Sequence, residues 1–212
     1  MKIGITSDCS SGLEYAPFEH HIKITRTTIH FKDEELIDGI DIKAEEFYRR
    51  LKETDIVPST SAPSLGEISK RVEELKAEGC TDVIHFPISF GLSAYGENLL
   101  NAFDNMVEGV KLHVFNCHSA CLMEGYCAHY AEILAERGYT VEEIMDECQK
   151  FADQTVAYLI VDDLKYLVKN GRLNAVSGFI GGLAKIKPIL QLAKNGTCLL
   201  YTSPSPRDVE ES

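Results

Sequence analysis

The sequence predicts an α/β fold with a mainly parallel sheet flanked by helices. Short apolar runs alternate with stretches of helical periodicity as far as residue 161, a pattern typical of parallel strands joined by helices. The clearest unit lies at 81–107, where an apolar run leads into the turn of Ser89, Gly91 and Ser93 and a helical pattern follows. Free backbone N–H groups are expected at this turn, which is a natural place to bind an anionic head group.

The other elements follow in order along the chain. Apolar or alternating runs predict strands at 2–6, 111–115 and 154–161, with one or two more within 21–31. Helical spacing, together with capping residues such as Ser64 and Thr140, predicts helices at 43–54, 65–78, 121–137 and 141–152. A hydroxyl-rich stretch between two prolines, 58–64, is expected to be a stiff loop.

The regular alternation of strand and helix patterns ends after the first 161 residues. We expect residues 1–161 to form an N-terminal α/β domain and 162–197 to begin a second domain that is truncated. Within this second part, the apolar run 185–192 contains a proline and is expected to be an edge strand. The stretch 198–212 resembles the translation of a sequencing adapter, so we interpret it as a non-native tail.

Composition limits the possible functions and compartment. The chain has 212 residues and a formal net charge of −12, which argues against general nucleic-acid binding. No apolar run approaches the length of a transmembrane segment, and the N-terminus does not have the pattern of a signal peptide. The 7 scattered cysteines are then best explained as reduced thiols, which predicts a cytoplasmic protein.

Three polar segments are candidates for a binding site. Asp8 follows the first strand, Thr60 and Ser61 lie in the proline-bounded stretch, and Ser93 lies in the central turn. Strand ends meet at one edge of a parallel sheet, so these side chains are expected near one another. Each also has an ordinary explanation as a turn or capping residue. The spacing of the cysteines and histidines at 117–129 fits no standard zinc pattern, so no metal site is expected.

Six motifs run in order through nearly all of residues 1–197: IGITSDCSSGL at the start, DGIDI–EEFY at 38–48, TSAPS at 60–64, ISFGLSA at 88–94, DDLKYLVKNGRL at 162–173 and IKPIL at 186–190. In order and spacing, these motifs resemble those of the DegV family of bacterial fatty-acid-binding proteins. The turn departs from the family's pattern, because Phe90, Ala94 and Tyr95 replace a serine, a glycine and a threonine.

The resemblance implies a DegV-like two-domain architecture that holds a long-chain fatty acid between its domains. It also implies a non-catalytic subunit without a cofactor, which presents the acid to a separate fatty acid kinase catalytic subunit for acyl-phosphate formation. The carboxylate would be held by Thr60, Ser61 and Ser93, with Arg172 and Asp8 as possible contacts of the head group or the partner. An apolar tunnel would hold the acyl tail, and its plausible lining is Phe90, Leu92, Phe179, Ile180 and Leu183.

Other functions remain open on the sequence alone. The stretch from Gly91 to Gly96 half-matches the nucleophile elbow of serine hydrolases, which would make Ser93 a nucleophile. A dinucleotide-binding enzyme is disfavoured because no GxGxxG motif follows the first strand. An α/β domain that binds only another protein is the plainest alternative.

Overall fold

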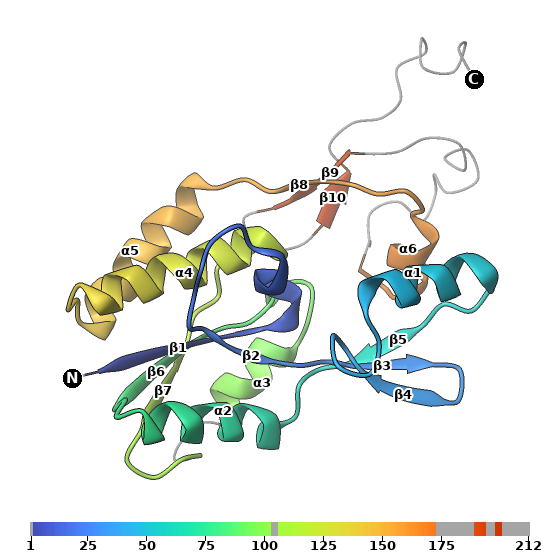
Figure 1. Ribbon diagram of the computed structural model, residues 1–212. Helices are drawn as coiled ribbons and strands as arrows, with labels where there is room; N and C mark the ends of the chain where they lie inside the picture. The colour runs from blue at the N-terminus through green and yellow to red at the C-terminus, as the bar shows by residue number, and fades with distance from the viewer. Residues whose placement is uncertain (1, 103–105, 173–188, 194–197, 201–212) are drawn as a thin grey trace.

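The computed structural model describes residues 2–102, 106–172, 189–193 and 198–200. In this part of the chain there are three sheets, one parallel and two antiparallel. Helices flank the parallel sheet, and the two smaller sheets lie beyond the end of the parallel sheet that is far from the N-terminus (Figure 1). The predicted α/β fold with a mainly parallel central sheet is therefore confirmed.

The central sheet is wholly parallel, and its strand order is β2-β1-β6-β7. Its strands are β1 (Ile3–Asp8), β2 (Lys23–Thr25), β6 (Asp82–Phe86) and β7 (Lys111–Val114). Both β1 and β6 are buried on both faces, including the polar Thr6, Ser7 and Asp8 at the carboxyl end of β1. Because all four strands run the same way, their carboxyl ends meet at a single edge of the sheet.

Four helices cover the central sheet, two on each face (Figure 1). They are α4 (Leu122–Glu136) and α5 (Val141–Gln154) on one face, and α2 (Leu65–Ala77) and α3 (Tyr95–Ala102) on the other. Successive side chains of a strand point to opposite faces, so Ile84 packs with α4 and α5 whereas Val83 packs with α2 and α3. The predicted helix after the central turn thus exists, and its described part ends at residue 102.

Capping residues set the helix starts that the sequence predicts. The Thr140 hydroxyl accepts a hydrogen bond from the Glu143 N–H, and the Glu143 carboxylate accepts one from the Thr140 N–H, which completes a capping box at the start of α5. The Ser64 hydroxyl accepts the Glu67 N–H at 3.1 Å at the start of α2. No helix of the described residues is long and apolar enough to span a membrane.

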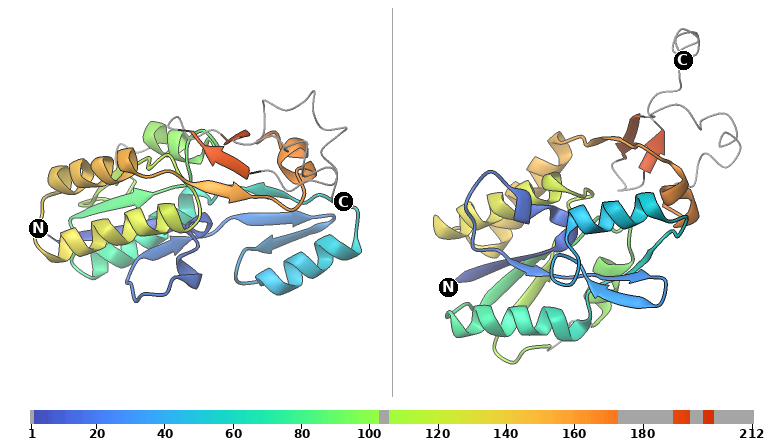
Figure 2. Two further views of the ribbon diagram at one scale, coloured as in Figure 1. Left: turned by 90° about the horizontal axis from the view of Figure 1, so that it is seen from above. Right: turned by 45° about the vertical axis from the view of Figure 1, so that its right-hand side comes forward.

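Two antiparallel sheets lie at the carboxyl end of the central sheet (Figure 2). One has the order β4-β3-β5 and packs against α1 (Ala44–Glu53); its strands are β3 (Thr28–Phe31), β4 (Glu34–Ile37) and β5 (Ser59–Ser61). The other has the order β10-β9-β8 and packs against α6 (Lys165–Lys169). Its strands are β8 (Tyr158–Ile160), β9 (Ile189–Leu192) and β10 (Cys198–Leu200).

Two sequence predictions about these smaller sheets are wrong. The expected loop 58–64 contains strand β5, whose exposed Ser59–Ser61 pairs with the free edge of β3 and shows no apolar alternation. The expected edge strand in 185–192 is instead β9, the central strand of its sheet, with β8 on one side and β10 on the other. None of the residues of β9, Ile189–Leu192, is a proline, so each has an N–H group for pairing in the sheet.

Candidate functional site

A cavity of about 350 Å³ lies where the ends of β1 and β6 meet the two smaller sheets. Every sheet contributes to its wall, as do α6 and the turn before α3. The lining residues are Asp8, Cys9, Ser10, Thr27, Asp38, Thr60, Ala62, Pro63, Ile88, Leu92, Ser93, Tyr95, Leu159, Leu167, Arg172 and Leu192. The size is within the usual range for a small-molecule pocket.

The lining has both polar and apolar parts. Hydroxyl and charged groups come from the end of β1 and the residues after it, from Thr27 and Asp38 beside the first antiparallel sheet, from β5, from the turn before α3 and from Arg172. Leu159 on β8, Leu192 on β9 and Leu167 on α6 form an apolar part, and Ala62, Pro63, Ile88 and Leu92 add apolar groups next to the polar ones. A ligand with a polar head and an apolar body therefore finds matching surfaces within one cavity.

Asp8 closes the cavity at the carboxyl end of β1 and is only 2% exposed. Its two carboxylate oxygens accept the Ser10 N–H at 2.8 Å and the Ile88 N–H at 2.9 Å, and the Ser10 hydroxyl also donates to it. Burial raises the pKa of Asp8, although these hydrogen bonds work in the opposite direction. The carboxyl group thus ties the segment after β1 to the segment after β6.

A second buried carboxyl group lies behind Asp8. Glu124, near the start of α4, is fully buried, and its oxygens lie 3.0 Å from the Ser7 hydroxyl and 2.9 Å from the Ser10 hydroxyl. Burial raises the pKa of Glu124 well above its ordinary value, and the nearby charge of Asp8 adds to the effect. Nothing in the local sequence pattern of α4 singled out this residue.

Thr60 and Ser61 are adjacent in the sequence but lie on opposite faces of β5, because side chains alternate along a strand. Thr60 pairs with Ile29 of β3 and lines the cavity. The Ser61 hydroxyl lies 2.6 Å from Nε2 of His30 and is not part of the lining. The structure therefore brings Thr60, but not Ser61, to the expected position.

The turn before α3 uses its backbone N–H groups internally. The Leu92 and Ser93 N–H groups donate to the Ser89 carbonyl at 2.9 and 3.1 Å, so the expectation of free N–H groups at Ser93 is wrong for these two. The Ser93 hydroxyl oxygen accepts the Tyr95 N–H at 3.2 Å, which leaves its own hydrogen available to donate into the cavity. The side chain, more than the backbone, is thus the donor at this turn.

Arg172 lines the same cavity, directly after α6. Its Nε donates to the Leu92 carbonyl at 3.4 Å, and its own N–H donates to the Leu167 carbonyl at 2.9 Å. These contacts hold a guanidinium group beside the Ser93 turn. A cation and two hydroxyl groups, on Thr60 and Ser93, therefore line one cavity.

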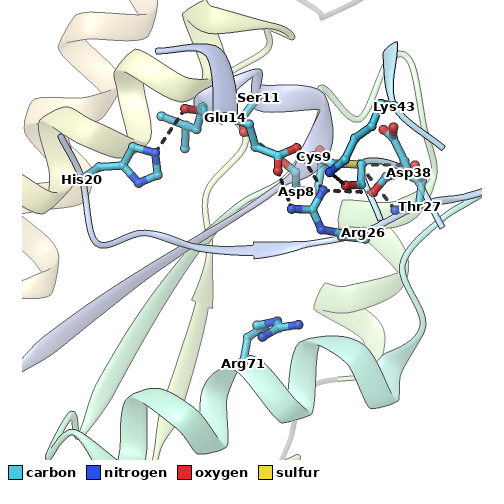
Figure 3. A network of polar contacts seen from close by, with 12 residues as sticks. Asp8, Cys9, Ser11, Glu14, His20, Arg26, Thr27, Asp38, Lys43 and Arg71 are labelled. Atoms are coloured by element: carbon cyan, nitrogen blue, oxygen red, sulfur yellow. Dashed lines mark hydrogen bonds and ion pairs between the residues drawn. The ribbon is translucent and has the colours of Figure 1, made fainter. Parts of the chain in front are cut away.

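A charged cluster holds the segment that carries Asp38 against the cavity (Figure 3). The Arg26 guanidinium donates to both Glu14 carboxylate oxygens, at 2.9 and 2.6 Å, and to the Asp38 carbonyl at 2.9 Å. The Arg26 partner lowers the pKa of Glu14. Beside this cluster, the Cys9 thiol lies 3.3 Å from the Thr27 hydroxyl. Both Thr27 and Asp38 line the cavity and were missed by the sequence analysis.

The expected tail-lining residues have different locations. Leu92 lines the cavity, whereas Phe90 is outside its lining and its ring occupies the space next to Gly96. Phe179, Ile180 and Leu183 lie outside the described residues. The apolar lining that the structure does describe, on β8, β9 and α6, was not identified from the sequence. Its leucines come from segments too short for a clear periodicity.

A hydrolase would need a base beside Ser93. None of the described residues that line the cavity is a histidine, and the contact given for the Ser93 hydroxyl is with the Tyr95 N–H. Among the described residues there is also no group of three or more side chains that could hold a metal ion. The geometry of the described cavity thus favours binding of a polar head over nucleophilic catalysis by Ser93.

Comparison with known proteins gives consistent matches over nearly the whole chain. A family model described as an uncharacterised protein of the DegV family matches residues 2–202. A DegV domain-containing protein of Staphylococcus aureus is 35% identical over 193 residues, which are 90% of this chain and 67% of that protein. Protein DegV of Bacillus subtilis is 31% identical over 195 residues, or 90% of this chain and 68% of that protein.

Solved structures match as well. The crystal structure of DegV from Bacillus subtilis, described as a fatty acid binding protein, has a TM-score of 0.82 and 29% identity, and the match covers 100% of this chain and 75% of that chain. A DegV lipid binding protein from Thermotoga maritima has a TM-score of 0.80 and 26% identity, and the match covers 100% of this chain and 74% of that chain.

Proposed function

This chain belongs to the DegV family, and from that premise we propose that it binds a long-chain fatty acid in the cavity at the carboxyl ends of β1 and β6. The observation that carries the proposal is that one cavity presents both hydroxyl and cationic donors and an apolar surface of leucines. The description of the Bacillus subtilis structure as a fatty acid binding protein supports it.

The head group would bind at Thr60, Ser93 and Arg172. A carboxylate needs several donors, and the two hydroxyl groups and the guanidinium supply them from three different elements. Hydrogen bonds from a cation to a carboxylate are stronger than those between neutral groups. The side chain of Arg172 contacts backbone carbonyls and forms no ion pair with another described residue. Its positive charge is therefore available to the ligand.

The acyl tail would extend from this wall toward Leu159, Leu167 and Leu192. Transfer of a methylene group from water to such a surface is worth about 0.8 kcal/mol, which favours long chains over short ones. The same surface is continuous with a buried cluster that includes Leu164 and Leu190. Ligand binding would thus join the second antiparallel sheet to the central domain through the tail.

We further propose that the protein is a non-catalytic subunit in the cytoplasm. It would present the carboxylate to the catalytic subunit of a fatty acid kinase, which would form the acyl phosphate. Thr60 and Arg172 are exposed and lie on the same wall as Ser93, so a head group held there would stay close to the surface. Phosphoryl transfer would use the partner's own residues.

Titration with a long-chain fatty acid tests the binding proposal. Ser93→Ala removes one donor to the carboxylate and should weaken affinity about fivefold to tenfold, which corresponds to about 1–1.5 kcal/mol. The titration is followed by fluorescence displacement, and native mass spectrometry checks for one lipid per chain. A matched control is Ser69→Ala, since the Ser69 hydroxyl donates to the Leu65 carbonyl on α2 away from the cavity.

The two variants separate the possible outcomes. Equal loss of affinity in both would show that serine removal acts through the fold, and unchanged affinity in Ser93→Ala would remove Ser93 from the site. A wild-type chain that binds neither saturated nor unsaturated long-chain acids would contradict the proposed function as a whole.

A further inference from the structure

We define the carboxyl wall as Asp8, Ser10 and Glu124. The hydroxyls of Ser7 and Ser10 make more oxygen–oxygen contacts at hydrogen-bond distance than they have protons to donate. The Ser10 hydroxyl lies within hydrogen-bond distance of both Asp8 and Glu124. The Ser7 hydroxyl lies 2.8 Å from the Phe86 carbonyl and 3.0 Å from Glu124. Each hydroxyl has one proton to donate, and a backbone carbonyl has none. The two hydroxyl protons can serve only two of these four contacts, and a proton on one carboxyl group would serve a third.

The hydrogen bonds indicate which carboxyl group holds that proton. Asp8 accepts two backbone N–H groups, from Ser10 and Ile88, and such donors stabilise the ionised form. Glu124 is fully buried, and the partners given for its side chain are the hydroxyls of Ser7 and Ser10, both of which can accept as well as donate. Glu124 is thus the better place for the proton.

Among the described residues, no Lys, Arg or His side chain hydrogen-bonds to either carboxyl group of this pair. The titratable groups that face it are Cys9 after β1, Tyr95 on α3 and Cys117 after β7, and none of these is a cation. Burial raises the pKa of Cys9 to about 11 and that of Tyr95 above its ordinary value. Two ionised carboxylates in contact through one hydroxyl would therefore be uncompensated, which is strongly unfavourable.

We propose that Glu124 is a proton-holding positioning residue. Its neutral carboxyl group, linked to Asp8 through the Ser10 hydroxyl, keeps the carboxyl wall at a single negative charge, so that an anionic head group can bind beside Asp8. Asp8 and Ser10 line the cavity whereas Glu124 lies behind them, so Glu124 acts through these two residues. The link to ligand binding rests on the proposed function, and the location of the proton does not.

Infrared spectroscopy of the lipid-free protein tests the location of the proton. At neutral pH we expect a carbonyl band of a protonated carboxyl group that shifts when glutamate is labelled with carbon-13. The band should be absent from Glu124→Gln and present in Glu132→Gln. Glu132 is the matched control, because it is a largely buried glutamate of the same helix that accepts the His21 N–H at 2.7 Å and lies away from the cavity. The labelled wild type needs no substitution, and absence of its band would overturn the proposal.

Thermal unfolding gives a second measurement without ligand. A glutamate that is protonated in the folded state and ionised in the unfolded state above about pH 4.3 makes stability fall as the pH rises. The melting temperature of the wild type should therefore fall by about 4 °C per pH unit relative to Glu124→Gln, until the folded-state pKa is reached. Parallel curves for the two proteins would contradict a proton on Glu124.

Binding measurements test the link to the ligand. Raising the pH until Glu124 ionises should weaken the affinity of the wild type for a long-chain acid at least tenfold, whereas the affinity of Glu124→Gln should change less than threefold over the same range. A long-chain alcohol of the same length carries no charge and should show no such loss in either protein. Equal losses for the acid in both proteins would contradict the link. Failure of both acid and alcohol to bind any of the proteins would instead contradict the proposed function.

Discussion

Two walls of the same cavity differ in whether their polar groups have hydrogen-bond partners within the protein. In the carboxyl wall, Asp8 and Glu124 are buried and satisfied by Ser7, Ser10 and the backbone. We define the open wall as Thr60, Ser93 and Arg172. Here the Thr60 hydroxyl makes no hydrogen bond with another described residue, and the hydrogen of the Ser93 hydroxyl is free to donate. Bonds within the protein stabilise the fold, and donors without an internal partner are available for a ligand.

Because of this difference, residues that determine stability and residues that determine ligand affinity lie in separate parts of the same cavity. Substitutions in the carboxyl wall should mainly change the free energy of unfolding, because they leave buried groups without partners. Substitutions in the open wall should mainly change ligand affinity, because their partner is absent until the ligand binds. Each prediction below tests one side of this contrast.

Asp8→Ala should have the largest effect. It removes the acceptor of the Ser10 N–H, the Ser10 hydroxyl and the Ile88 N–H in a buried position, and we expect a loss of about 4 kcal/mol in the free energy of unfolding. Urea unfolding of the lipid-free protein measures it. Asp33→Ala, at an exposed turn position, is the control and should stay within about 0.5 kcal/mol of the wild type. A mild effect at Asp8 would remove the contrast between the walls.

His85, on β6 of the central sheet, makes stability depend on acid pH. It is fully buried with Nδ1 2.8 Å from the Thr6 hydroxyl, and burial lowers its pKa from 6.5 to about 3. Between these two values the unfolded chain binds a proton that the folded chain does not, so stability falls as the pH falls. Relative to His85→Gln, the wild type should lose about 1.4 kcal/mol per pH unit below about pH 6.5. Identical acid unfolding curves would show that His85 is accessible to protons in the fold.

Much of this contrast could be anticipated from the sequence, because it follows from the parallel sheet. Asp8 is the last residue of β1 and Ser93 follows the end of β6, the neighbouring strand of the same direction, and the structure brings both to one cavity. Thr60 and Arg172 reach the same cavity from segments that the family motifs had marked. Chain direction and strand order are enough to explain why such distant positions meet.

The rest depended on packing that leaves no local pattern. A glutamate in a helix usually faces solvent, and Glu124 is buried because α4 crosses close to the segment after β1. Gly125 permits this approach, since a Cβ at that position would lie 2.7 Å from the Ser11 carbonyl oxygen. The separation of Ser61 from Thr60 has a different origin, because side chains alternate along a strand and the sequence analysis did not recognise β5.

The adjacent pair Thr60 and Ser61 offers the most direct test of the account. Thr60→Val removes a hydroxyl from the open wall with little change in shape, and Ser61→Ala removes one from the opposite face of the same strand, where it contacts His30. Titration of both variants with a long-chain fatty acid compares the two faces of β5. We predict an affinity loss of about fivefold, or about 1 kcal/mol, for Thr60→Val and less than twofold for Ser61→Ala. Equal losses, or a larger loss at Ser61, would contradict the placement of the carboxylate on the open wall.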